Sequence, residues 1–138
     1  MKKSGRPAPN PPCPCGSLRP YATCCAQYHS AATPPPDAET LMRARYAAYC
    51  LGNAEFLLAT WHPDHRPEDL DLNASPAPKW LGLKVLRHTP VDADHAEVEF
   101  VARYRVQGRA QRLHETSRFL RESGRWLYVD GDLHADLP

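Results

Sequence analysis

The sequence has no hydrophobic run long enough to cross a membrane. No stretch approaches the ~18 consecutive apolar residues that a membrane helix needs, and the polar start from Met1 to Pro12 lacks the apolar core of a signal peptide. The length of 138 residues leaves room for one ordinary hydrophobic core but not for two. We therefore expect a cytoplasmic protein, not bound to a membrane, with one main domain and a small appendage.

Acidic residues are absent from the first 36 positions. The rest of the chain is mildly acidic, because the whole sequence has a formal charge of only +1. A basic segment suggests contact with an anionic partner such as a ribosome or a nucleic acid, but four cations are also typical of a solvated tail. The cations of this segment are Lys2, Lys3, Arg6 and Arg19.

Four of the five cysteines form a cluster, Cys13, Cys15, Cys24 and Cys25. In a reducing compartment an odd, clustered set indicates metal or redox chemistry more than disulfides. Two close pairs separated by a loop can surround one zinc ion, which accepts four thiolates tetrahedrally at about 2.3 Å. The spacing predicts one structural Zn²⁺ per chain.

Three alternatives to the four-cysteine site stay open: a disulfide, a thiol redox switch, and a zinc site with His29 in place of Cys25. The segment from Cys13 to His29 has few residues to bury. Ordering its ~17 residues costs about 1–2 kcal/mol each, whereas a structural zinc contributes roughly 10–16 kcal/mol. Metal is therefore expected to hold this segment in shape.

Two helices are predicted after the Pro34–Pro36 run. Asp37 can cap a helix over residues 38–51, where apolar residues recur at helical spacing. Asn53 can cap a second helix, which must end near His62 because Pro63 disfavours helical geometry in the residue before it.

From Trp80 onward the apolar pattern has a period of two, which indicates strands. Short breaks between them favour an antiparallel meander. Helices followed by such a sheet give an α+β fold in which the helices cover one face of the sheet. The description fits a nuclear-transport-factor-2-like cone with a pocket on its concave face. The expected strands span residues 80–89, 95–107, 110–122 and 125–130.

Several motifs resemble known families. Cys-Pro-Cys-Gly-Ser, then a tyrosine, then Cys-Cys resembles the SEC-C zinc motif of the SecA translocation ATPase, although Leu18, Arg19 and Pro20 replace its usual glycine and lysine residues. Further along, Leu-Met-Arg-Ala-Arg-Tyr-Ala-Ala-Tyr, Thr-Trp-His-Pro, His-Glu-Thr-Ser-Arg-Phe and Trp-Leu-Tyr-Val-Asp-Gly are similar to the bacterial YchJ family. The resemblance implies a zinc knuckle followed by a nuclear-transport-factor-2-like domain. It supplies no substrate.

The proline run between the two parts leads us to expect that they fold independently, with only the knuckle depending on metal. The expected segments are a flexible basic, proline-rich tail (1–11), a SEC-C zinc knuckle (12–32), a proline linker (33–36), the nuclear-transport-factor-2-like domain (37–132) and a second tail (133–138).

Two arginines, Arg43 and Arg45, interrupt the apolar face of the first helix. An arginine directed toward a core needs either a carboxylate partner or a bound anion. A structural ion pair between helix and sheet and an anion-binding pocket are the two interpretations. The carboxylates that could supply the ion pair are Glu99, Glu115 and Asp130.

Strand alternation separates two rows of polar residues. Glu115, Ser117 and Phe119 could face the pocket, so that His114, Thr116 and Arg118 would face outward or contact a second copy of the chain in a homodimer. His62 is either a pocket base or a hydrogen-bond donor that ends the second helix.

Two classes of function remain. The leading hypothesis is a non-enzymatic binding or adaptor protein that takes a protein partner or a small ligand, because the sequence contains no nucleophile paired with a base and no phosphate-binding loop. The alternative is an isomerase, dehydratase or hydrolase that uses the cone pocket, for which fold analogy is the only support. Its catalytic candidates would be Tyr46, His62, Tyr104 and Asp130.

Overall fold

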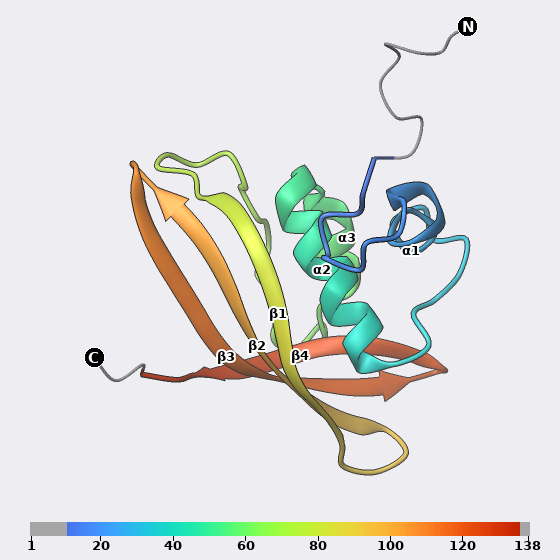
Figure 1. Cartoon of the computed structure of the whole chain (residues 1–138). Helices are drawn as coiled ribbons and strands as arrows, with labels where there is room; N and C mark the ends of the chain where they lie inside the picture. Colours follow the sequence, from blue (N-terminus) through green and yellow to red (C-terminus); the bar gives the residue numbers. More distant parts are fainter. Residues whose placement is uncertain (1–10, 136–138) are drawn as a thin grey trace, which may run out of the picture.

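A computed structural model describes residues 11–135 of the chain. Three short helical segments precede or follow one long helix, α2, and a four-stranded antiparallel sheet completes the fold in the order β1-β2-β3-β4. Figure 1 shows α2 and α3 on one side of the strongly curved sheet. The elements are η1 (Tyr21–Thr23), α1 (Ala26–His29), α2 (Ala38–Leu51), α3 (Ala54–Ala59), β1 (Lys79–Pro90), β2 (His95–Val106), β3 (Arg109–Glu122) and β4 (Arg125–Leu133).

Both main helices begin where their capping residues predict, and α3 ends at Ala59, before the end predicted near His62. The Asp37 side chain accepts a hydrogen bond from the Thr40 backbone N–H at 2.8 Å, which satisfies one of the free donors of the first turn of α2. Gly52 ends this helix in the left-handed conformation, with φ of 74°. Asn53 then caps α3 by accepting from the Phe56 N–H at 3.0 Å. Only Gly52 and Asn53 therefore separate α2 from α3.

Irregularities in the strand register bend the sheet. The pairing of β1 with β2 shifts at two places, and the pairing of β3 with β4 shifts between Arg118 and Phe119, where Val129 has no partner. Such bulges bend a strand and increase its twist. The concave face carries the buried row Ala96, Val98, Phe100 and Ala102 of β2 against α2.

The N-terminal segment packs directly on the main domain. The His29 ring donates from Nε2 to the Ala44 carbonyl of α2 at 2.8 Å and lies 4.7 Å from the Phe56 ring. The Arg43 guanidinium donates to the Cys15 carbonyl at 3.0 Å, and the four clustered cysteines belong to the same buried core as α2. These contacts differ from the expected independence of the two parts, because side chains bridge the region that the prolines separate in sequence.

The basic N-terminal segment and the C-terminal tail are only partly within the described residues. The basic residues Lys2, Lys3 and Arg6 lie outside the described residues, as does the end of the tail expected at 133–138. The sheet continues through Leu133, which pairs with Glu115. Within residues 11–135, none of the helices has the length and apolar character required to cross a membrane.

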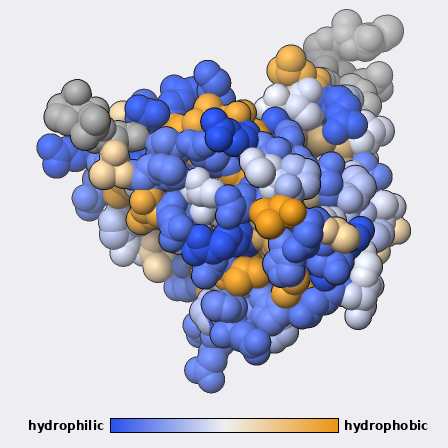
Figure 2. Space-filling view, turned by 90° about the horizontal axis from the view of Figure 1, so that it is seen from below, coloured by the Kyte–Doolittle hydropathy of each residue, from blue (hydrophilic) through white to orange (hydrophobic). Residues whose placement is uncertain are grey.

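The outer surface is polar over most of the face seen in Figure 2. Hydrophobic residues form small, separate patches there among hydrophilic ones. Isolated patches of this kind are ordinary for the surface of a monomer. The face in view therefore has no broad apolar area on which a protein partner would dock.

Removing the N-terminal segment should destabilise the remaining domain. A chain that starts at Asp37 would lose the His29 ring from Phe56 and the hydrogen bond on Ala44. Exposing one large side chain costs about 1.5–3 kcal/mol, which corresponds to a fall of about 6–20 °C in Tm for a domain of this size. Thermal melts followed by circular dichroism test this. A shortened chain that melts cooperatively within a few degrees of the full chain would restore the expectation of independent parts.

Candidate functional site

A cavity of about 230 Å³ lies between α2 and the concave face of the sheet. Helix α2 contributes Met42, Arg45, Tyr46 and Tyr49, which recur at helical spacing on one face. Aromatic rings form most of the wall. The other lining residues are Trp61, Trp80, Phe100, Ala102, Leu113, Glu115, Ser117, Phe119 and Tyr128.

Arg45 supplies a buried cation at one end of this cavity. Its side chain donates from Nη1 to the Leu57 carbonyl at 2.8 Å and to the Thr60 hydroxyl at 2.7 Å. The guanidinium carbon lies 5.1 Å from the ring centre of Trp61 and 4.6 Å from that of Tyr128, within the range of cation–π attraction. Burial lowers the pKa of Arg45 to about 10, so the side chain stays a cation at neutral pH.

No carboxylate lies within 4.0 Å of this cation among residues 11–135, and Glu115 acts on it electrostatically from beyond that distance. None of the three predicted acidic partners lies within 4.0 Å of its guanidinium, so the expected ion pair between helix and sheet is not formed. Glu99 instead contacts His114 at 2.7 Å, and Asp130 accepts from Arg118 at 2.6 Å. The positive charge of Arg45 therefore faces a cavity.

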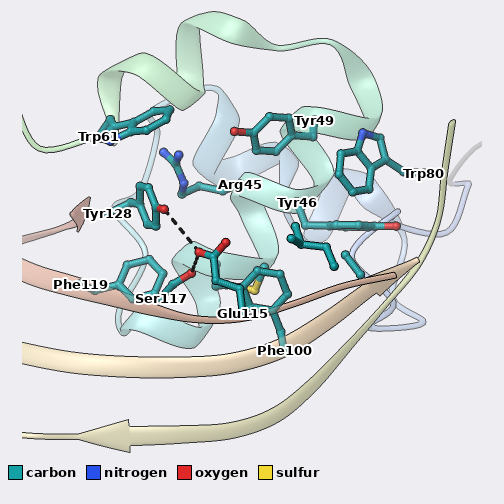
Figure 3. Close-up of a pocket in the computed structure, with 13 residues that line it drawn as sticks. Arg45, Tyr46, Tyr49, Trp61, Trp80, Phe100, Glu115, Ser117, Phe119 and Tyr128 are labelled. Atoms are coloured by element: carbon teal, nitrogen blue, oxygen red, sulfur yellow. Dashed lines mark hydrogen bonds between the residues drawn. The ribbon is translucent and has the colours of Figure 1, made fainter. Parts of the chain in front are cut away.

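Glu115 brings a carboxylate to the same cavity from the opposite wall. Figure 3 shows the Arg45 side chain of α2 between Trp61 and Tyr128, and the Glu115 carboxylate of β3 directed toward the Tyr128 hydroxyl. The carboxylate Oε2 accepts from the Ser117 hydroxyl at 2.6 Å and from the Tyr128 hydroxyl at 3.4 Å. It packs against Gly131, where a Cβ atom would collide with Oε2. These contacts fix the position of Glu115 without using its second oxygen.

The remaining wall is aromatic. The Tyr46 and Trp80 rings meet edge to face at 5.8 Å between centres, and Tyr49 lies at the same distance from Trp80. Burial raises the pKa of Tyr46, Tyr49 and Tyr128, so their hydroxyls stay protonated at neutral pH. The Trp61 Nε1–H is buried and has no hydrogen-bond acceptor within the described residues. The cavity thus offers hydrogen-bond donors and ring faces beside its two charges.

Arg43 and His62, both predicted as pocket residues, do not line the cavity. Arg43 bonds to Glu39 at 3.1 Å and to the knuckle, because two residues along a helix turn a side chain by about 200°. His62 is directed away from the cavity. Its Nε2 lies 3.2 Å from Glu122, and its Nδ1 accepts from the Asp64 N–H, so it neither acts as a pocket base nor donates to the end of α3.

Two predicted residues on the strands also lie outside the cavity. Tyr104 packs 5.2 Å from Trp80, which lies in the cavity lining while Tyr104 does not. Asp130 is on the outer face with Arg118, because the bulge at Val129 reverses the alternation that would otherwise place it beside Tyr128. The four candidates of the enzyme hypothesis therefore do not converge, and Tyr46 alone among them lines the cavity.

The row Glu115, Ser117 and Phe119 lines the cavity, as strand alternation predicts. Alternation places His114 and Thr116 on the other face of β3, where the His114 ring stacks on that of His134 at 4.1 Å between centres. Glu99, His114 and His134 bring potential ligand atoms within 4.8 Å of one another. The two rings are nearly parallel, inclined by 12°, and His114 Nε2 lies 2.7 Å from the Glu99 carboxylate.

Several residues of the cavity lining are not among the candidates named from the sequence. Trp61, Trp80 and Tyr128 are three of them. Met42 and Tyr49 lie three positions before and four positions after Arg45, so helical spacing alone places them on the same face. Helical spacing could therefore have identified Met42 and Tyr49 as cavity residues from the sequence.

The four clustered thiols form the second candidate site. Their sulfur atoms lie within 4.8 Å of one another, with 3.6 Å between Cys15 and Cys24 and 4.0 Å between Cys24 and Cys25. All four side chains are buried. The Ser17 hydroxyl lies 3.2 Å from the Cys24 sulfur, and Arg19 donates to it at 3.8 Å. This cluster could hold a metal ion.

His29 is occupied by other contacts. Its Nδ1 accepts from the Tyr21 hydroxyl at 2.7 Å, while Nε2 donates to Ala44. Both ring nitrogens are therefore used in the neutral form, and burial lowers the pKa of His29 in agreement with that form. As placed, the ring joins the knuckle to α2 and has no nitrogen to offer as a fourth ligand.

Comparison with known proteins agrees with this division of the chain. Residues 37–131 match the family model for the YchJ middle nuclear-transport-factor-2-like domain, and residues 10–27 match the SEC-C motif. A UPF0225 protein of Polaromonas naphthalenivorans is 54% identical over 133 residues, which cover 88% of this chain and 96% of that protein. One from Ralstonia nicotianae is 53% identical and covers 92% of this chain and 94% of that protein.

Two solved structures share the fold over nearly the whole chain. The solution structure of a SEC-C motif containing protein from Rhodopseudomonas palustris has a TM-score of 0.80 and 32% identity, covering 90% of this chain and 99% of that one. The crystal structure of a SEC-C motif containing protein from Psychrobacter arcticus has a TM-score of 0.73 and 28% identity, covering 93% and 85%. The predicted α+β fold is thus confirmed, and the chain belongs to the YchJ family, in which a SEC-C motif precedes a nuclear-transport-factor-2-like domain.

Proposed function

We propose that this protein is a non-enzymatic binding protein that holds a small organic ligand in the cavity between α2 and the sheet. The observation that carries the proposal is the buried Arg45 cation, which faces this cavity without a carboxylate within 4.0 Å. Buried charges are ordinarily paired. A ligand with an acceptor or anionic group would supply the missing partner.

The groups in the cavity suit binding better than proton transfer. General acid–base catalysis works best with a pKa near the working pH. Here the tyrosine hydroxyls have raised pKa values, and the pKa of Arg45 is about 10. No histidine is among the lining residues within the described chain. These side chains position a ligand through hydrogen bonds and ring contacts.

We further propose that the four cysteines hold one structural zinc. Four thiolates at about 2.3 Å from a tetrahedral ion lie about 3.8 Å apart, and the separations of 3.6 and 4.0 Å fall on either side of that value. Four protein ligands leave no open position for substrate. The ion would thus hold the knuckle in shape, and the knuckle in turn packs on α2 through Arg43 and His29.

The fourth ligand can be tested by two matched substitutions. Cys25→Ser should release the metal, because it removes one of four thiolates, whereas His29→Ala should keep about one zinc per chain and lower Tm by several degrees. Metal analysis of the purified proteins gives the stoichiometry, and thermal melts give the stability. Zinc retained in Cys25→Ser and lost in His29→Ala would assign the histidine instead.

Ligand binding can be tested by mapping fragments onto the cavity. Neutral, anionic and cationic fragments screened by NMR should produce saturable shifts at Arg45, Tyr46 and Ser117, accompanied by changes in tryptophan fluorescence from Trp61 and Trp80. A library in which no fragment perturbs these positions in zinc-loaded protein would contradict the proposal.

A glycine beneath Glu115 provides a variant for the same measurement. Gly131→Ala adds a methyl group where the Glu115 carboxylate lies and should displace that flexible side chain. We expect fragment affinity to fall about tenfold or more, equivalent to ~1.4 kcal/mol, with Tm changed by only a few degrees. Glu99→Gln, on the outer face, is the matched control and should leave the affinity unchanged. Equal affinities in all three proteins would remove Glu115 from the binding site.

A further inference from the structure

We infer that the cavity selects a small zwitterion of the amino-acid type, with a carboxylate against Arg45, an ammonium group against Glu115 and an apolar or aromatic side chain against the ring wall. The inference deepens the proposed function and rests on it. It follows from the presence of two opposite charges in one small cavity that lie farther apart than a salt bridge of 4.0 Å allows.

The Arg45 end is built for a carboxylate. One guanidinium nitrogen, Nη1, donates to Leu57 and Thr60 and anchors the group. A guanidinium has five N–H donors in a planar fork that matches a carboxylate. The Tyr49 hydroxyl interacts with the same guanidinium, and its raised pKa keeps it a donor. A carboxylate here would accept hydrogen bonds and neutralise a cation that is 6% exposed.

The Glu115 end is built for a donor or a cation. Ser117 and Tyr128 both donate to Oε2, and none of the described residues donates to Oε1. These two bonds and the space above Gly131 hold the carboxylate in place before any ligand arrives. An ammonium group has three donors and could reach Oε1 while facing the rings of the cavity wall.

The two charges together weaken the binding of ligands with a single charge. An anion held by Arg45 would lie in about 230 Å³ with the Glu115 carboxylate, and a cation held by Glu115 would lie with the Arg45 guanidinium. Like charges this close in a partly desolvated space repel strongly. A zwitterion avoids this repulsion, because its carboxylate can lie at Arg45 while its ammonium group lies at Glu115.

The size and lining of the cavity set the third part of the ligand. Ligand pockets for drug-sized molecules occupy roughly 300–1,000 Å³, so this cavity fits a smaller molecule. Beyond the charged groups the wall includes Tyr46, Trp80, Phe100 and Leu113. Such a wall accepts a phenyl or branched aliphatic side chain. A volume of about 230 Å³ is too small to enclose a peptide.

Matched sets of ligands test the charge requirement directly. We would titrate zinc-loaded full-length protein with L-phenylalanine, 3-phenylpropionate and 2-phenylethylamine, and with L-leucine, 4-methylpentanoate and 3-methylbutylamine, by calorimetry and tryptophan fluorescence. At least one amino acid should bind at least about tenfold more tightly than both of its single-charge analogues. If neither amino acid exceeds its analogues, the inference is overturned.

Glu115→Gln isolates the cationic subsite without changing its shape. This variant should weaken the amino acid about tenfold or more and strengthen the deaminated acid, because it removes the negative charge that repels an anion. Glu99→Gln is the control on the other face of the sheet and should reproduce the unmodified protein. Unchanged selectivity in Glu115→Gln would overturn the role of Glu115.

The same experiments distinguish failure of this inference from failure of the proposed function. Fragments that shift the resonances of Arg45 and Ser117, combined with no preference for zwitterions, leave the binding function intact and reject only the ligand class. Absence of any fragment from the cavity rejects both.

Discussion

The buried charge of Arg45 constrains the rest of the main domain. Burial lowers the pKa of Arg45 from 12.5 to about 10, a net cost of roughly 3 kcal/mol to the charged form. Its hydrogen bonds to Leu57 and Thr60 and its position over the Trp61 and Tyr128 rings offset part of that cost. Because these partners come from α3, the following segment and β4, the guanidinium fixes how the helices sit on the sheet. The Arg45 side chain thereby forms one end of the cavity.

Helix α2 connects the two candidate sites because it has two functional faces. One face carries Arg43 and the Ala44 carbonyl, which bond to Cys15 and His29 of the knuckle. The other carries Arg45 and Tyr46, which line the cavity. Any loss of order in the knuckle removes support from the helix that forms one cavity wall. A metal in the cysteine cluster would therefore act on ligand binding through the position of α2, without contacting the ligand.

Much of this arrangement follows from local sequence rules. Capping by Asp37 and Asn53 and the alternation along β3 place the helices and the row Glu115–Phe119 as expected. Asp130 was predicted to belong to the pocket but lies outside it, because a bulge at Val129 adds one residue to the strict alternation of the strand. The alternation of apolar and polar residues in a strand does not show where an extra, bulged residue is inserted. The packing of the knuckle on α2 was also not predicted. His29 contacts Ala44 from the other side of the proline run, and a run of prolines gives no sign of contacts between the segments that it separates.

The separation of Arg45 from Glu115 is itself an argument for a ligand. Two opposite charges in a low-dielectric space attract strongly, and a direct pair would relieve the desolvation of both. Instead, each is held by neutral partners on its own wall: Arg45 by Thr60 and the Leu57 carbonyl, Glu115 by Ser117. A purely structural role would be served as well by a direct pair, or by apolar residues of similar volume. Charges that are fixed apart, with donors and an acceptor still available between them, are instead preorganised for a molecule that bridges the gap.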